Sequence, residues 1–271
     1  MPRPITFLSD YGLADEFVGV VHAVIARICP DARIIDLGHG VPRHDVVAGA
    51  LALARAVPYA APGVHLAVVD PEVGARRRAV ALRTAQEERI LVGPDNGLLI
   101  PAAERFGGVA EAVEISHSPW RLEPVSATFH GRDVFAPVTA RLAGGEPFAA
   151  AGAPLDPAGL VRLERPRAHR DADGSIVAHA VATDAFGNVL LDLDHGQLGE
   201  FGWLRLGRAL RLRRGDRVVR AQYVRTFADV APGELLVYED ASQTVAIAVN
   251  SGDAAAELAL RAGDEVRISA P

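Results

Sequence analysis

The chain has 271 residues, of which 49% are hydrophobic and 23% charged, with a formal net charge of -6. This composition supports a packed core and argues against disorder, and the acidic balance gives no electrostatic case for nucleic acid as a partner. All 28 basic residues are arginines. The missing lysine excludes Schiff-base and pyridoxal phosphate enzymes, P-loop NTPases and protein kinases.

The sequence predicts a cytoplasmic protein without a membrane segment. Residues 1–4 lead straight into a predicted strand, so we expect no cleavable signal. The longest apolar run, residues 46–54, is too short to span a bilayer. The single cysteine, Cys29, excludes an internal disulfide and fits a reducing compartment. The abundance of alanine and arginine indicates a G+C-rich bacterial genome.

Residues 1–162 are predicted to form an α/β domain, because strand-like apolar runs alternate with amphipathic helices. The predicted strands cover residues 5–8, 33–37, 64–69, 78–83, 89–92 and 112–115. The predicted helices run from an Asp15 N-cap to about residue 28, from an Asp45 cap through 57, from 98 to 106, and from an Asp133 cap through 141. This alternation implies a mostly parallel sheet with helices on both faces.

The pattern changes near residue 155, where prolines and glycine mark a linker. Residues 172–271 are predicted to form a smaller domain, an antiparallel β-barrel or sandwich, because short alternating runs follow one another with little helix. The predicted strands of this domain cover residues 175–182, 203–206, 210–212, 235–238, 245–249 and 265–268.

One stretch near the middle of the first domain carries the strongest chemical signal. The apolar run 64–69 ends on Asp70, followed by a proline, a glycine and the arginines 76–78. This pattern predicts a buried parallel strand that delivers Asp70 to the carboxyl edge of the sheet, with a turn that folds cations back towards it. Ligands bind at that edge in open α/β sheets.

Other turns with polar residues suggest several kinds of site. Asp10, Asp15, His39, Asp70 and His130 offer metal ligands, but no pair has metalloprotease spacing, and arginines crowd Asp70 and His130. We therefore predict no metal. No G-x-S-x-G elbow is present for a hydrolase serine, and no G-x-G-x-x-G follows the first strand for a dinucleotide or methyltransferase loop.

The remaining polar turns are either structural turns or parts of a ligand-binding site. Residues 94–97, Pro-Asp-Asn-Gly, are interpreted as a structural turn. Asp10 lies at a strand end with free approach, which suits the hydroxyl pair of a ribose. Phe129, Phe186 and Phe227 are compatible with core positions. Phe129 and Phe186, however, lie in polar turns that contain glycine, which is unusual for a core residue, and a stacked base would explain them.

Five blocks, in order, resemble the signature blocks of the S-adenosylmethionine (SAM) hydroxide adenosyltransferases, a family of SAM hydrolases related to the fluorinase and chlorinase. The blocks cover residues 9–12, 69–78, 93–99, 128–133 and 184–188. The resemblance implies an N-terminal α/β domain, a C-terminal barrel-like domain and a homotrimer with active sites at subunit interfaces. It also implies cleavage of SAM by water at the ribose C5′, giving adenosine and L-methionine, with no cofactor.

The family's site residues carry over to matching positions of this chain. The water-handling trio falls on Asp70, Arg77 and His130. The expected substrate contacts are Asp10 for the ribose, Asp184 for the methionine, Phe186, Asn188 and Phe227 for the adenine, and in addition Phe129 and Ser251. Two departures stand out: residues 238–242 lack the Asn-Ser pair of relatives, and Glu72 replaces a usual glycine. Glu72 either alters the local backbone or adds a second carboxylate.

The chemistry of the trio stands beside the resemblance. The sulfonium of SAM is already a good leaving group, so an aligned nucleophile is the main requirement. Asp70 can accept a hydrogen bond from water, Arg77 can offset the charge of developing hydroxide, and His130 can orient the water or take its proton. The alternatives are a non-catalytic SAM or nucleoside-binding module, a SAM-dependent halogenase and a metal-dependent hydrolase.

Overall fold

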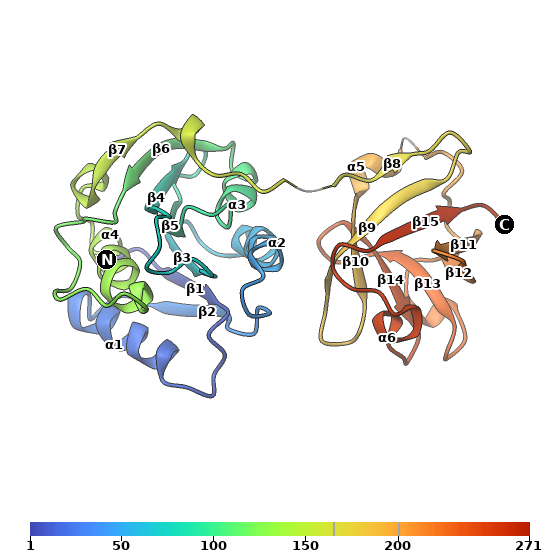
Figure 1. Cartoon of the computed structure of the whole chain (residues 1–271), viewed down its shortest axis with the longest axis horizontal. Helices are drawn as coiled ribbons and strands as arrows, with labels where there is room; N and C mark the ends of the chain where they lie inside the picture. Colours follow the sequence, from blue (N-terminus) through green and yellow to red (C-terminus); the bar gives the residue numbers. More distant parts are fainter. Residues whose placement is uncertain (165, 200) are drawn as a thin grey trace. The chain divides into compact units, whose positions relative to one another are not determined.

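The computed structural model describes residues 1–164, 166–199 and 201–271. The chain divides into two compact units, Met1–Leu163 and Glu164–Pro271. Each unit has a sheet and a hydrophobic core of its own (Figure 1). Across the described residues, no helix has both the length and the apolar character needed to cross a bilayer.

The first unit is built on a seven-stranded sheet with the order β2-β1-β3-β5-β4-β6-β7. Strands β2, β1, β3 and β5 pair in parallel, whereas β4, β6 and β7 join through antiparallel pairs. The strands are β1 Ile5–Ser9, β2 Ile34–Gly38, β3 Val64–Val68, β4 Ala79–Thr84, β5 Ile90–Pro94, β6 Val109–Glu114 and β7 Ala153–Leu155. The predicted α/β class is confirmed, and its parallel strands are those that carry the cavity described below.

Helices cover both faces of this sheet (Figure 1). One face packs against α1 and α4 around buried Phe7 and Leu66, and the other packs against α2 and α3 around buried Leu8 and Leu91. Adjacent residues of β1 thus serve opposite cores, as the two-residue period of a strand requires. The helices are α1 Phe17–Ile28, α2 Val46–Ala56, α3 Ile100–Glu104 and α4 Ala136–Ala143, the last preceded by a π-helix, Gly131–Phe135.

The three predicted helix caps have different outcomes. The Asp45 cap is confirmed, because its side chain accepts a hydrogen bond from the Ala48 N–H at 2.9 Å. The Asp15 cap is wrong: α1 begins at Phe17, its N-cap is Glu16, and the chain between Gly12 and α1 bends past a cavity. The Asp133 cap is also wrong, since the helix already begins with the π-helical turn at Gly131. Asp133 instead accepts a hydrogen bond from the Ser126 N–H and pairs with Arg132.

The second unit is a closed β-barrel. Its strands follow the order β10-β14-β13-β12-β11-β15-β9-β8, and an additional β9–β10 pairing closes seven of them into a ring. All pairs are antiparallel except β12–β13. The strands are β8 His169–Arg170, β9 Ile176–Thr183, β10 Val189–Asp194, β11 Ala209–Arg214, β12 Arg217–Tyr223, β13 Leu235–Glu239, β14 Thr244–Val249 and β15 Glu265–Ser269.

Sequence patterning misplaced part of this barrel. Residues 203–206 form turns and irregular chain rather than a strand, although Leu204 is buried in the barrel core. The pattern also missed β10 and β12. In β12 the arginines alternate poorly with apolar residues, and pairing with β11 and β13 makes it a strand.

The short remaining elements are the helices α5 His195–Leu198 and α6 Ala254–Leu258, and the 3₁₀ turns Val57–Tyr59, Phe148–Ala151, Pro157–Gly159 and Phe227–Asp229.

Candidate active site

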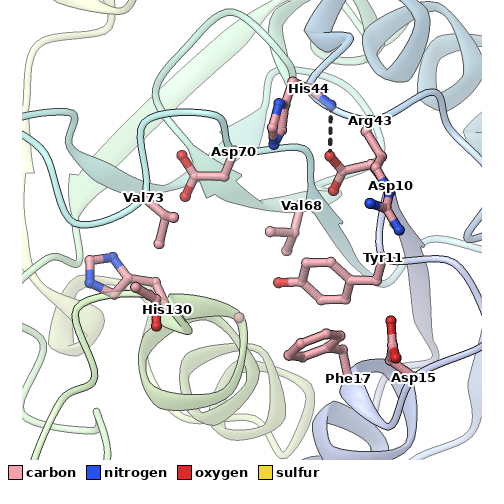
Figure 2. Close-up of a pocket in the computed structure, with 12 residues that line it drawn as sticks. Asp10, Tyr11, Asp15, Phe17, Arg43, His44, Val68, Asp70, Val73 and His130 are labelled. Carbon is pink, nitrogen blue, oxygen red and sulfur yellow. Dashed lines mark hydrogen bonds between the residues drawn. The ribbon is translucent and has the colours of Figure 1, made fainter.

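A cavity of about 320 Å³ opens at the carboxyl ends of the parallel strands of the first unit (Figure 2). Asp10 follows β1, Asp70 follows β3, and His130 directly precedes the π-helix. The cavity is lined by Asp10, Tyr11, Asp15, Phe17, Arg43, His44, Val68, Asp70, Val73, Thr128, His130 and Gly131. The predicted placement of Asp70 at the carboxyl edge of the sheet is therefore confirmed.

Arg77 joins two of the predicted catalytic residues. Its Nε donates to both carboxylate oxygens of Asp70, at 2.9 and 3.0 Å, and its Nη2 donates to Oδ2. The side chains of Asp70 and Arg77 are only 5% and 4% exposed. The same Nη2 lies 2.8 Å from Nδ1 of His130. The predicted return of a cation towards Asp70 is confirmed for Arg77.

The contact with Arg77 defines the protonation of His130. A guanidinium group has donors only, so Nδ1 of His130 must accept this hydrogen bond and carry no proton. The ring is then neutral with its proton on Nε2. Burial and the neighbouring Arg77 charge both lower the pKa of His130, which agrees with a neutral ring, although Asp70 and Asp133 oppose the shift.

The loop between β3 and β4 is held against the segment before the π-helix. Gly74 has a φ of 78°, and a Cβ at this position would lie 2.3 Å from the carbonyl oxygen of Ala127. Only glycine therefore allows the two segments to approach this closely. Glu72 is exposed in the same loop, and its carbonyl accepts a hydrogen bond from the Ala75 N–H.

The turn at residues 94–97 supports the end of β3. The Asn96 side chain donates to the Val69 carbonyl at 2.9 Å, one residue before Asp70. Asp95 is buried, pairs with Arg78 and accepts from the Val161 N–H at 2.9 Å. Both side chains therefore have structural partners, as the interpretation of this segment as a turn requires.

Asp10 and Tyr11 form another wall of the cavity. The Asp10 carboxylate accepts a hydrogen bond from the His44 N–H at 2.9 Å (Figure 2). Burial, followed by the charges of Asp10 and Asp70, raises the pKa of the Tyr11 phenol, so Tyr11 is a neutral hydroxyl facing the cavity.

The aromatic side chains at this end pack edge to face. The ring of Phe129 lies 6.0 Å from Tyr11 and 5.1 Å from Phe17, with interplanar angles of 77° and 90°. The Arg132 guanidinium lies 5.2 Å from the centre of the same ring. Phe129 is therefore partly a packing residue that holds Tyr11 and Phe17 in place.

The second unit contains the other predicted contact residues. Asp184 lies in the turn between β9 and β10, where its carboxylate accepts from the N–H groups of Phe186 and Asn188, each at 2.9 Å. The Asn188 amide also donates to Asp184 at 2.8 Å. This turn leaves the Phe186 ring 79% exposed, although Asn188 is buried.

A second aromatic group lies on the same unit. The rings of Phe227 and Tyr238 are 5.0 Å apart. Burial, then the charges of Asp184 and Asp240, raise the pKa of Tyr238 to about 12, so this phenol is neutral and within electrostatic reach of Asp184. Ser251 has a φ of 61° and its hydroxyl donates to Asn250 at 3.2 Å.

The structure thus places Asp10, Asp70 and His130 in the lining of one cavity of the first unit. Arg77 contacts Asp70 and His130, and Phe129 packs against the cavity residues Tyr11 and Phe17. Asp184, Phe186, Asn188, Phe227 and Ser251 all belong to the second unit. Sequence reasoning missed Tyr11, Arg43 and His44 as cavity residues. Tyr11 belongs to the first of the five family blocks, residues 9–12. Arg43 and His44 lie in the turn after β2, at the same edge of the sheet.

Comparison with known protein families shows which family this chain matches. The SAM hydroxide adenosyltransferase N-terminal domain matches residues 5–152, and the C-terminal domain of the same family matches residues 178–267. The chain belongs to the SAM hydroxide adenosyltransferase family. The two matches cover strands β1 to β6 of the first sheet, its cavity and most of the barrel.

Similar proteins extend over nearly the full length. A protein from Salinispora tropica is 52% identical over 270 residues, covering 99% of both chains, and one from Thermus thermophilus is 38% identical, covering 98% of this chain and 99% of that protein. Both are named (R)-S-adenosyl-L-methionine hydrolase. A fluorinase from Nocardia brasiliensis is more distant, at 29% identity over 98% of this chain and 97% of its own.

Solved structures share the fold. The crystal structure of a conserved protein from Thermotoga maritima is 37% identical, with a TM-score of 0.89 over 97% of this chain and 99% of that one. A second structure, from Thermus thermophilus, is 36% identical with a TM-score of 0.77, over 98% of this chain and all of that one.

Proposed function

We propose that the chain hydrolyses S-adenosyl-L-methionine to adenosine and L-methionine. The observation that carries this proposal is the joining of Asp70 and His130 by Arg77 in the cavity at the strand ends. Relatives at 52% and 38% identity, both named (R)-S-adenosyl-L-methionine hydrolase, support the same reaction and favour the (R) epimer at sulfur as the substrate.

The proposed reaction is a single displacement at the ribose C5′. A bond forms between the water oxygen and C5′, while the C5′–S bond breaks and its electron pair returns to sulfur as the thioether of methionine. The water proton passes to a carboxylate acceptor. Because the positive sulfonium becomes a neutral sulfide, the substrate supplies its own activated leaving group and the reaction uses no cofactor.

Asp70 is the proposed proton acceptor. It presents carboxylate oxygens to the cavity, and Arg77 holds them at fixed positions through a bidentate contact. His130 is not suited to this role in the observed arrangement, because Nδ1 is occupied by Arg77 and Nε2 carries the proton. We assign to His130 the donation of its Nε2–H to the water oxygen, which orients the lone pair for attack.

The same acceptor distinguishes water from halide as a nucleophile. Water donates a hydrogen bond to Asp70, whereas a halide has no proton to donate and meets only the lone pairs of the carboxylate. A full negative charge 4 Å from a halide would cost about 4 kcal/mol at an effective dielectric constant of 20, and Arg77 offsets part of this. Hydrolysis is therefore favoured over halogenation.

We propose that the remaining residues bind the substrate. Asp10 accepts hydrogen bonds from the ribose hydroxyls, and Asp184 binds the ammonium group of the methionine. The adenine contacts Phe186, Asn188 and Phe227, and Phe129 and Ser251 are further substrate-binding residues. The exposure of Phe186 supports this role, because an aromatic residue that is 79% exposed has a ring face available for a base.

The assembly is also a proposal. A homotrimer with active sites at subunit interfaces follows from the resemblance described above. A cytoplasmic location is proposed separately, because the chain has a single cysteine. Residues 1–162 and 172–271 are the proposed domains. They divide the substrate contacts between them, so a complete site needs both.

The direct test is incubation of the purified chain with each sulfonium epimer of SAM, followed by chromatography of the products. Adenosine and L-methionine in equal amounts, formed faster from the (R) epimer, are expected. Release of adenine, or of S-adenosylhomocysteine by methyl transfer, would refute the proposal. Tight binding without any product would instead indicate a nucleoside-binding module.

A further inference from the structure

A cluster of two histidines and one aspartate lies outside the residues that line the cavity. Nε2 of His22, on α1, lies 2.8 Å from Oδ1 of Asp36, on β2. Nε2 of His39, just after β2, lies 3.2 Å from the same oxygen. All three atoms fall within 4.8 Å of one another, and residues 1–164, 166–199 and 201–271 contain no second His, Cys, Asp or Glu group of this kind.

The buried Nε2 atom of His39 is a second, independent observation that points to a ligand at this cluster. Its side chain is 2% exposed, and among the described residues its Nε2 has no hydrogen-bond partner. Nδ1 of the same ring contacts the Ser9 hydroxyl at 2.8 Å. When Nδ1–H donates to Ser9, Nε2 carries a lone pair that faces the lone pairs of Asp36. In the other tautomer the Nε2–H group makes no hydrogen bond within the described residues either. A buried nitrogen without a partner is costly, and a cation between it and Asp36 would remove that cost.

The donor set and its surroundings match a transition metal. Two imidazoles and one carboxylate are ligands of zinc and of similar divalent ions, with bonds of about 2.0–2.2 Å. Tetrahedral bonds of this length place neighbouring ligand atoms roughly 3.3 Å apart. The separation of 3.2 Å between His39 and Asp36 matches this value, whereas the hydrogen-bonded pair His22 and Asp36, at 2.8 Å, has to move slightly apart to admit an ion. Phe7 packs against both imidazole rings, at 6.1 Å from His22 and 4.7 Å from His39, and Ser9 holds the far nitrogen of His39.

Solvent reaches one side of the cluster. The His22 and Asp36 side chains are 33% and 39% exposed, so an ion can enter from solvent and keep water as a further ligand. We propose that His22, Asp36 and His39 bind one divalent transition-metal ion of the zinc class. The ion stabilises the first unit by linking α1 to β2 and, through the contact of His39 with Ser9, to the end of β1 just before Asp10. It takes no part in the proposed hydrolysis, so its test is independent of that reaction.

The test uses tag-free protein stripped with a chelator and titrated with zinc chloride by calorimetry and by thermal unfolding. We expect one zinc ion per chain and a higher midpoint of unfolding. His22→Gln keeps a hydrogen-bond donor for Asp36 but removes the ligand nitrogen, and Asp36→Asn removes the charge. Each should weaken zinc binding by at least about 10–100-fold, the loss that even residues supporting a metal ligand cause.

A matched control separates this cluster from ordinary surface histidines. His195 pairs with Glu239 at 2.6 Å, and among the described residues this pair has no third ligand. His195→Gln should therefore leave zinc stoichiometry and affinity unchanged. The proposal is overturned if wild-type protein binds no zinc, or if His22→Gln and Asp36→Asn, folded by circular dichroism, bind it as tightly as the wild type. Loss of binding in His195→Gln would place the ion elsewhere.

Discussion

Replacing Asp70 with asparagine changes both the chemistry of the cavity and its stability. Arg77 donates to both carboxylate oxygens, whereas an asparagine offers one acceptor and turns an N–H₂ group towards a donor. Because both side chains are at most 5% exposed, the Arg77 charge is left without a buried carboxylate to balance it, although His130 still accepts its hydrogen bond. Removing one partner of such a pair costs about 3–5 kcal/mol of stability. Loss of the positioned proton acceptor costs about 10²–10⁴-fold in rate.

The two effects are separated by measuring the rate on folded protein. The assay is single-turnover cleavage of SAM, normalised to the folded fraction by circular dichroism, with substrate affinity measured by calorimetry. Asp95→Asn is the matched control, because it breaks the nearby Arg78–Asp95 pair, whose carboxylate is 3% exposed. This control should lose stability and keep its rate per folded molecule.

The outcome for Asp70→Asn decides the role of the carboxylate. We expect the chemical step to slow by about 10²–10⁴-fold, with affinity nearly unchanged. An unchanged chemical step in folded Asp70→Asn would refute the assignment of Asp70 as proton acceptor. A large loss of affinity with normal chemistry would make it a binding residue instead.

Three further predictions follow from the first unit and the proposed assembly. Burial, then the Arg89 charge, lowers the pKa of His65 from 6.5 to about 3, so the unfolded chain binds more protons between these values. The contribution of His65 to the free energy of unfolding is therefore fully present above pH 6.5 and falls by about 1.4 kcal/mol per pH unit as the pH decreases. Urea unfolding between pH 7 and 5 should show a free energy of unfolding that depends less steeply on pH in His65→Gln than in the wild type. A Cβ on Gly131 would lie 2.1 Å from the Tyr11 hydroxyl, so Gly131→Ala should cost about 1–3 kcal/mol, with partial recovery on adding Tyr11→Phe; equal stability of the single and double variants would contradict this. Light scattering should give the mass of a homotrimer, and a fully active monomer would contradict the proposed intersubunit site.

The parallel strands and the position of Asp70 were predictable because their signals are local. An apolar run that ends on an acid, followed by proline, glycine and arginines, specifies a buried strand and its turn. The Asp45 cap was predictable for the same reason, since a cap bonds within its own first turn.

Asp15 and Asp133 show why a cap-like residue is not sufficient. Both precede helical segments, but tertiary contacts decide where each helix begins. Phe17 packs on Tyr11 and Phe129, and Asp133 is drawn to Ser126 and Arg132. Neither set of contacts is visible from residue spacing.

The His22–Asp36–His39 cluster lies beyond sequence patterning for a different reason. The sequence offers His39 as a metal ligand only together with residues of other turns, Asp10, Asp15, Asp70 and His130. His22 comes from α1 and reaches Asp36 only because α1 packs across the strand that contains it. The contact from the His44 backbone to Asp10 is equally hidden, since an N–H group is present at nearly every position.

The central claim is that water attacks C5′ of SAM in the cavity lined by Asp70 and His130, the two residues that Arg77 joins. The most direct measurement is the reaction in ¹⁸O-labelled water, followed by mass spectrometry of the nucleoside product without added metal, phosphate or halide. Displacement by water predicts adenosine with one ¹⁸O atom at its 5′-hydroxyl and unlabelled L-methionine. Adenosine without the label, or label carried by methionine or by free ribose, would contradict attack of water at C5′.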